Sequence, residues 1–110
     1  MRYLMFSIPS GTRTSPSPEQ RAELRELVEA AIASGSLLAR GNLSPAQEER
    51  HVVSNGGRVT VTDGPFAEST EVIAGFAVFD LPSQEAAIDT AKQLLRLSGD
   101  GVVTLRPLLD

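Results

Sequence analysis

The sequence predicts an α+β domain with the ferredoxin-like βαββαβ order and an inserted β-hairpin. Two segments with apolar residues at helical spacing each follow one apolar strand and precede another. Between these two halves, residues 51–62 carry an Asn-Gly pair flanked by alternating valines, which is typical of a tight hairpin. Without that hairpin, the order is the one in which two helices cover one face of an antiparallel sheet.

The first half of the chain begins with a strand over residues 2–8, which are apolar on both alternating sides. The motif Ser17-Pro18-Glu19-Gln20 predicts a helix start, because a serine cap, a proline at the first position and a glutamine that completes a capping box are typical of one. Gly35 is expected to end this helix, and residues 37–43 to form the second strand. The charged residues of the helix are expected to lie mostly outside, namely Arg21, Glu23, Arg25, Glu26 and Glu29.

The predicted hairpin has two different faces. If its turn contains two residues, Val52, Val59 and Val61 share one face. The opposite face then carries His51, Val53, Arg58, Thr60 and Thr62. A turn of three residues would break this parity.

The second half of the chain repeats the strand–helix–strand pattern. A strand is predicted over residues 73–80, a helix that starts at Pro82-Ser83, and a last strand over residues 102–106. Gly75 is expected to let another backbone or side chain approach closely.

The strand over residues 73–80 bears on the oligomeric state, because it is apolar on both faces: Phe76 and Val78 point one way, and Ala77 and Phe79 the other. Two helices cover only one face of a four-stranded sheet, so the other face needs a second cover. A second copy of the chain is the simplest cover, and we therefore expect a homodimer. The alternatives are a half-exposed face, or a face covered by the hairpin.

Composition bounds the function classes. The 110 residues predict one domain, spanning residues 1–110. The chain has no cysteine and one histidine, so no thiolate or multi-histidine metal site is expected. No cofactor is expected either. A net charge of −4 argues against nucleic acid as a partner. No apolar run approaches the roughly 20 residues of a membrane span, and the N-terminus is typical of a strand, so a cytoplasmic protein is expected.

A candidate binding site follows from the alternation of side chains along the strands. Leu4, Phe6 and Ile8 are the natural helix-facing set of the first strand, and Val103 and Leu105 that of the last. The opposite face is then expected to carry Tyr3, Ser7, Arg40, Asn42, Thr104 and Arg106. Apolar walls with a few convergent polar groups are typical of a small-molecule site. The alternative is that these groups pair with one another across a dimer interface.

Three carboxylates follow the hairpin and are candidate catalytic groups. Asp63 precedes Gly64-Pro65, where an aspartate can fix the turn by accepting backbone hydrogen bonds. Glu68 and Glu71 share one side if their segment forms a helical turn, and in an apolar pocket their repulsion could raise a pKa and supply a general base. The alternative is a solvated acidic loop, or salt bridges to arginine. Phe66 is expected to anchor this loop or to line the substrate site.

The run from Asp63 to Phe76, with its Asp-Gly-Pro-Phe-Ala-Glu core, closely resembles the signature of the DGPF proteins, a branch of the YCII-related family. The resemblance continues through the opening Arg-Tyr-Leu-Met-Phe and the ending Val-Thr-Leu-Arg-Pro-Leu. Thr70 and Ala74 depart from it, because the branch usually has lysine and glycine at these positions. The resemblance implies a dimeric α/β barrel whose two sheets enclose a pocket.

Two classes of function follow from the resemblance. The first is a small-molecule-binding protein or cofactor-free enzyme acting on a phenolic, lactone or acidic substrate, with Asp63 or Glu68 as base and Arg40 and Arg106 stabilising an anion. Asp63 could correspond to the aspartate of a histidine–aspartate pair proposed for the family, although the histidine is not matched in this chain. The second is a regulatory or sensory partner of an extracytoplasmic-function sigma factor, because DGPF proteins are associated with such factors.

Overall fold

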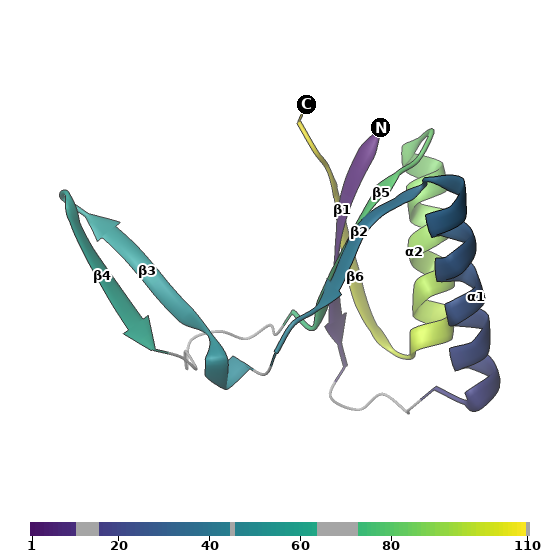
Figure 1. The fold of residues 1–110 in the computed structure, drawn as a ribbon, viewed down its shortest axis with the longest axis horizontal. Helices are drawn as coiled ribbons and strands as arrows, with labels where there is room; N and C mark the ends of the chain where they lie inside the picture. Colours follow the sequence, from purple (N-terminus) through teal and green to yellow (C-terminus); the bar gives the residue numbers. More distant parts are fainter. Residues whose placement is uncertain (11–15, 45, 64–72, 110) are drawn as a thin grey trace.

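The computed structural model describes residues 1–10, 16–44, 46–63 and 73–109 (Figure 1). In chain order its elements are β1 (Arg2–Pro9), α1 (Pro18–Ser34), β2 (Leu37–Asn42), the short 3-10 helix η1 (Ala46–Glu48), β3 (Arg50–Asn55), β4 (Arg58–Asp63), β5 (Gly75–Asp80), α2 (Gln84–Ser98) and β6 (Gly101–Pro107). The predicted α+β class, with two helices and an antiparallel sheet, is confirmed. Neither α1 nor α2, the two long helices of the described ranges, is long and apolar enough to cross a membrane.

Four strands form the main sheet in the order β2-β5-β1-β6, and each neighbouring pair is antiparallel. This order is the one expected for a ferredoxin-like βαββαβ arrangement. Both long helices lie on the same side of the sheet (Figure 1). We call that side of the sheet the helix face and the opposite side the far face.

The predicted start and end of α1 are both present. The Ser17 hydroxyl accepts a hydrogen bond from the backbone N–H of Gln20 at 3.1 Å, and the Gln20 side chain accepts one from the Ser17 N–H at 2.8 Å. At the other end, Gly35 adopts a left-handed φ of 81°, which glycine reaches at little cost. Short-range sequence signals therefore determine where this helix begins and ends.

Replacing Ser17 by alanine is expected to lower the free energy of unfolding by about 1 kcal/mol, because the capping hydrogen bond to Gln20 is lost. Urea denaturation followed by circular dichroism measures this change. Ser44→Ala is the matched control, since Ser44 is exposed and lies outside the helices and strands, and it should change stability by less than about 0.5 kcal/mol. Equal effects of the two substitutions would contradict the capping role.

The core lies between the helix face and the helices, and mostly beneath α2. Its buried residues are Tyr3, Met5, Leu37, Phe79, Ala87 and Ala91. Val103 and Leu105 pack against this cluster, as the sequence predicted.

The predicted orientation of β1 is wrong. Tyr3 and Met5 point to the helix face and are 1% and 2% exposed, whereas Leu4, Phe6 and Ile8 point to the far face. The Tyr3 hydroxyl meets the Met1 sulfur at 3.2 Å, so its polar end has a partner while the ring is buried. Both sides of β1 are apolar, so alternation separates the two faces without saying which one the helices cover.

The far face is apolar and incompletely covered. Leu4, Phe6, Phe76 and Val78 are half-buried there, and Val102 is 56% exposed. Gly41 makes room for one of these side chains, because a Cβ at this position would lie 2.7 Å from the ring of Phe76. Gly75 behaves as predicted, since the Gly41 carbonyl oxygen and the Asn42 side chain approach it closely.

Strands β3 and β4 form a separate two-stranded sheet, which we call the arm (residues 50–63). Asn55 pairs with Arg58, so the turn contains two residues, Gly56 and Gly57, with φ angles of 60° and 82°. The left-handed residues are thus the two glycines and not Asn55. The valine parity predicted for a two-residue turn is confirmed: Val52, Val59 and Val61 share one side, which we call the valine face.

Candidate functional site

A cavity of about 550 Å³ lies between α1 and the helix face of the sheet. This volume is within the range of about 300–1,000 Å³ typical of small-molecule sites. Its apolar walls come from both layers: Leu24, Val28 and Ile32 of α1, Leu94 of α2, and Met5, Leu37, Ala77, Phe79 and Val103 of the sheet.

The cavity exists because α1 packs less closely on the sheet than α2 does. No residue of α1, which is described over its whole length, is buried, whereas Ala87, Ala91 and Leu97 of α2 are buried. Near its first turns α1 is held to α2, where the Gln20 amide donates to the Arg96 carbonyl oxygen at 3.1 Å and the Glu23 carboxylate lies 3.6 Å from the Arg96 guanidinium. Farther along the helix, Val28 and Ala31 pack against the core, and the cavity opens beside these contacts.

Polar side chains border this apolar space. Arg21, Arg25 and Glu29 contribute from α1, Arg40 and Asn42 from β2, and Ser7 from β1. Three arginines and one glutamate give the lining two net positive charges, in a chain whose net charge is −4.

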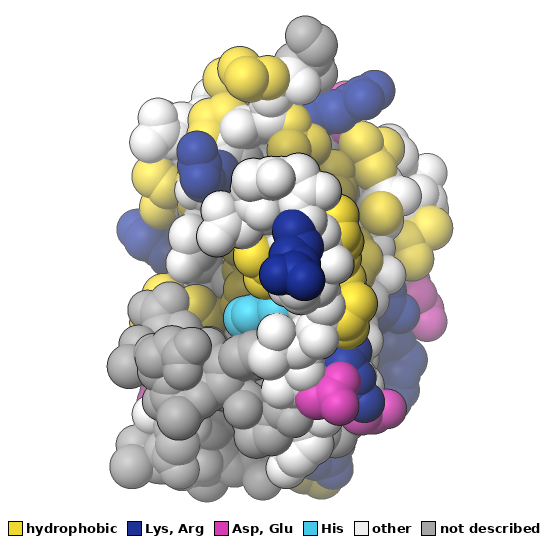
Figure 2. Space-filling view, turned by 90° about the vertical axis from the view of Figure 1, so that its left-hand side faces the viewer, with side chains coloured by type: hydrophobic (Ala, Val, Ile, Leu, Met, Phe, Trp, Pro, Cys, Tyr) yellow, Lys and Arg dark blue, Asp and Glu magenta, His cyan; other side chains and the backbone are white. Residues whose placement is uncertain are grey.

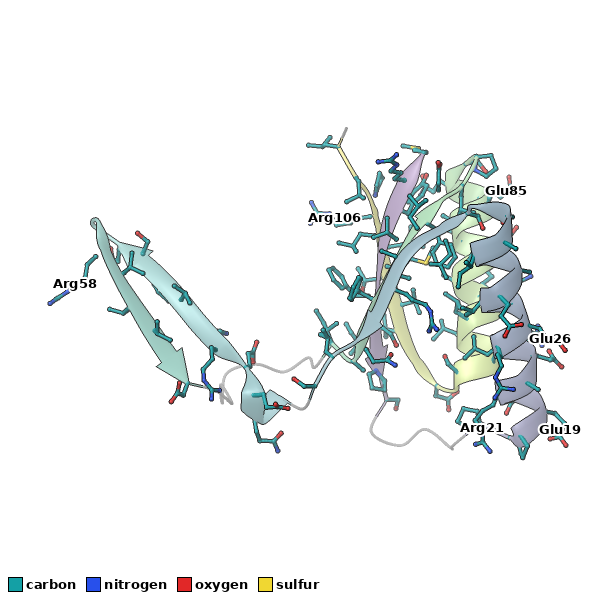
Figure 3. The ribbon with its side chains drawn as sticks, viewed as in Figure 1. Glu19, Arg21, Glu26, Arg58, Glu85 and Arg106 are labelled. Atoms are coloured by element: carbon teal, nitrogen blue, oxygen red, sulfur yellow. The ribbon has the colours of Figure 1, made fainter. Side chains whose placement is uncertain are left out.

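The arginines of the lining are available to a ligand to different degrees. Arg21 already donates to the Pro16 carbonyl oxygen at 2.9 Å. Within the described ranges, neither Arg25 nor Arg40 forms an ion pair. Figure 3 shows the acidic residues Glu19 and Glu26 on the outer side of α1, away from the sheet. The positive groups therefore border the cavity, while these two acids of the same helix face solvent.

The residues predicted for one binding face are divided between the two faces of the sheet. Ser7, Arg40 and Asn42 line the cavity on the helix face, and their assignment to the opposite face was wrong. Arg40 pairs with Ala77, whose side chain packs against the core, so both point toward the helices. Arg40 is nevertheless exposed, because β2 is an edge strand and its side chain reaches solvent.

Of the other predicted binding residues, the three that the structure describes do not line the cavity. Tyr3 is buried in the core, and Thr104 and Arg106 are exposed on the far face. Arg106 points away from the helices (Figure 3). Phe66 lies outside the described residues, as do the candidate catalytic residues Glu68 and Glu71.

Asp63, the remaining candidate catalytic residue, ends β4 and pairs with Arg50 at the base of the arm. The distance from its carboxylate to the Arg50 Nε is 2.9 Å, and its side chain is 77% exposed. An ion pair this exposed contributes at most about 1 kcal/mol. Asp63 does not line the cavity.

Sequence reasoning missed the contribution of α1 to the site, because it placed Arg21 and Arg25 outside. A signal was present: the two arginines are four residues apart, so they lie on one side of a helix, and Leu24 and Val28 flank Arg25 on the adjoining apolar stripe. Such residues lie at the border between the apolar and polar sides of a helix, where long arginine side chains can cover an apolar opening.

Comparisons with known proteins give a family match and a similar protein. A family model described as the YCII-related domain matches residues 1–110. The chain is also similar to "Uncharacterized protein R00369" of Rhizobium meliloti (strain 1021), with 34% identity over 78 residues, which are 70% of this chain and 63% of that protein. The match thus spans somewhat less than two thirds of the relative's length.

Proposed function

Since the chain belongs to the YCII-related family, we propose that it is a small-molecule-binding member that holds an acidic ligand in the cavity beneath α1. One observation carries this proposal: an apolar cavity of about 550 Å³ is bordered by three arginines. Capture of such a ligand is the first step of either a catalytic or a sensory role.

The chemistry of the lining defines the ligand class. A guanidinium group can donate two parallel hydrogen bonds to a carboxylate, and it remains charged at any physiological pH. The walls formed by Met5, Leu37 and Phe79 favour an aromatic or branched aliphatic body. The ligand we propose is therefore a small apolar acid or an acidic phenol, and not a sugar or a nucleotide.

A matched acid and amide test this proposal. We expect 3-chlorobenzoate to raise the thermal midpoint, and 3-chlorobenzamide, which has nearly the same shape without the charge, to raise it much less. At one hundred times the dissociation constant, a ligand raises the free energy of unfolding by about 2.7 kcal/mol, or roughly 10 °C in a domain of this size. The double variant Arg25→Gln/Arg40→Gln should weaken acid binding by at least tenfold.

Arg106→Gln is the matched control, because Arg106 lies on the far face of the same sheet. It should leave the affinity for the acid unchanged. An acid that binds the double variant as tightly as the parent would contradict the arginine site. If a panel of apolar acids and phenols produced no midpoint shift, the cavity would not be a binding site for this class.

We also propose that the protein works as a homodimer, with the arm as an addition to the βαββαβ domain and the two far faces turned toward each other as in a dimeric α/β barrel. The far face is a half-covered apolar surface, which soluble proteins rarely leave to water. The chain also exposes 7,884 Å², whereas a compact protein of its mass exposes about 5,900 Å². This excess supports an interface with another molecule.

A further inference from the structure

The arm has no core of its own. Val52, Val59 and Val61 on its valine face are 68%, 63% and 66% exposed. An isolated two-stranded hairpin is marginally stable at best in water, because its apolar face stays hydrated. The valine face therefore needs a surface on which to pack.

The arm projects away from the rest of the chain. Figure 1 shows it on the side of the sheet opposite to the helices. The radius of gyration is 16.2 Å, whereas a compact chain of this length has about 13 Å. Strands β3 and β4 contact each other extensively, and no other described element packs on them to a comparable extent. Viewed from the arm's side, hydrophobic side chains are visible behind the arm and above it (Figure 2).

We propose that in the homodimer the arm of each copy packs its valine face on the β6 edge of the partner's far face. This inference rests on the proposed homodimer and adds to it a specific exchange of arms. The β6 edge is the least covered part of the far face, since Val102 is 56% exposed and Thr104 and Arg106 are exposed beside it.

Symmetry brings the arm and this edge together. In chain order the arm follows β2 and precedes β5. Strand β2 forms one edge of the main sheet, and β6 forms the opposite edge. If two sheets face each other across a two-fold axis parallel to the strands, the β2 edge of one copy lies opposite the β6 edge of the other. Facing sheets pack about 10 Å apart, so an arm that projects from the far face runs alongside the partner.

The exposed area leaves room for exchanged arms in an interface between two copies. A sheet of four strands, each about six residues long, covers only about 400 Å² in plan, from a strand spacing of about 4.8 Å and a rise of about 3.4 Å per residue. The chain exposes roughly 2,000 Å² more than a compact protein of its mass. Stacking of the sheets alone would bury a minor part of this excess, and exchanged arms supply further interface on both copies.

Two pairs of neighbouring residues on the arm provide a matched test. Val52 and Val61 form a cross-strand pair on the valine face, and Val53 and Thr60 form the adjacent pair on the opposite face. In sedimentation velocity runs over a range of concentrations, Val52→Ser/Val61→Ser should raise the dimer dissociation constant by at least 100-fold. Val53→Ser/Thr60→Ser, which lowers strand propensity in the same two strands, should raise it less than fivefold.

The possible outcomes distinguish the role of the arm from the existence of the homodimer. A parent protein that is monomeric at every concentration overturns both the homodimer and the exchange of arms. A dimeric parent whose dissociation constant changes equally in the two double variants leaves the homodimer standing and overturns the role of the valine face.

A cross-linking experiment then distinguishes packing on the partner from packing on the arm's own sheet. The chain has no cysteine, so introduced thiols are unambiguous. An untagged Val59→Cys chain is mixed with an affinity-tagged Val102→Cys chain and treated with a short bismaleimide. We expect a covalent dimer that contains one tagged and one untagged chain. Cross-linking within single chains of the Val59→Cys/Val102→Cys double variant, with none between the mixed chains, would overturn the exchange.

Discussion

Replacing Phe79 by alanine is expected to lower the free energy of unfolding by about 3–5 kcal/mol. Phe79 is 3% exposed and lies between Tyr3 of β1 and Leu37 of β2 on the helix face. Its ring therefore joins three strands of the sheet to the buried alanines of α2. Because the buried core cluster has only six members within the described residues, the neighbours have little freedom to fill the space that the ring leaves.

Guanidinium denaturation monitored by circular dichroism measures this loss as a lower midpoint with an unchanged slope. Phe79→Leu is the matched control, since it keeps most of the apolar volume and should cost less than half as much. Lys92→Ala, on the exposed side of α2, should have almost no effect. A loss below about 1 kcal/mol for Phe79→Ala would contradict the described core.

Replacing Phe6 by aspartate is expected to convert the proposed homodimer to monomers, with a dissociation constant at least 1,000-fold higher. Phe6 points to the far face near its centre, between Phe76 of β5 and Thr104 of β6. Dimerisation would bury the new carboxylate without a partner, and the effective cost of burying an unpaired ion is several kcal/mol. In the symmetric dimer, the aspartate of the second copy would bring another negative charge close to the first.

Sedimentation equilibrium measures the change in mass, and circular dichroism shows whether the variant monomer is folded. Leu109→Asp is the control, because Leu109 is fully exposed beyond the end of β6 and should leave the dimer intact. If Phe6→Asp remains dimeric while folded, the far face is not the interface and the arrangement proposed for the two sheets is wrong.

Features determined by neighbouring residues could be predicted from the sequence. The capping box at Ser17, the end of α1 at Gly35 and the parity of the arm's valines all depend on residues within a few positions of each other. Backbone geometry and local hydrogen bonds determine such features, so the packing of distant elements does not change them.

The orientation of the sheet could not be predicted in the same way. Residues 2–8 and 75–79 are apolar on both sides, so hydrophobicity did not identify the helix face. Leu4, Phe6 and Ile8 were assigned to the helices, but the helix face instead carries Tyr3, Met5 and Phe79, which cluster with small alanines of α2. Arg40 was assigned to the far face because a charge inside a core is costly. At an edge strand this cost does not arise, because the guanidinium extends past the core into solvent.

The candidate site depends on the distance between two elements, which no local pattern encodes. Helix α1 is only weakly amphipathic, and its arginines beside the apolar stripe indicate a polar border without indicating that a cavity lies next to it. Arg25 and Arg40 are 15 positions apart in the sequence and border the same cavity only because α1 lies against the helix face of the sheet. The carboxylates Glu68 and Glu71, on which the sequence placed the chemistry, lie outside the described residues.

The looseness of α1 has a thermodynamic consequence. Because this helix has no fully buried side chain and reaches the core only through the half-buried contacts of Val28 and Ala31, we expect its docking to be coupled more weakly to the folding of the core than that of α2. A ligand in the cavity would touch both the helix and the sheet, and would act as the missing half of the core. Ligand binding in the cavity and docking of α1 on the sheet would then be linked equilibria. A higher concentration of a small acid would shift α1 toward the docked state.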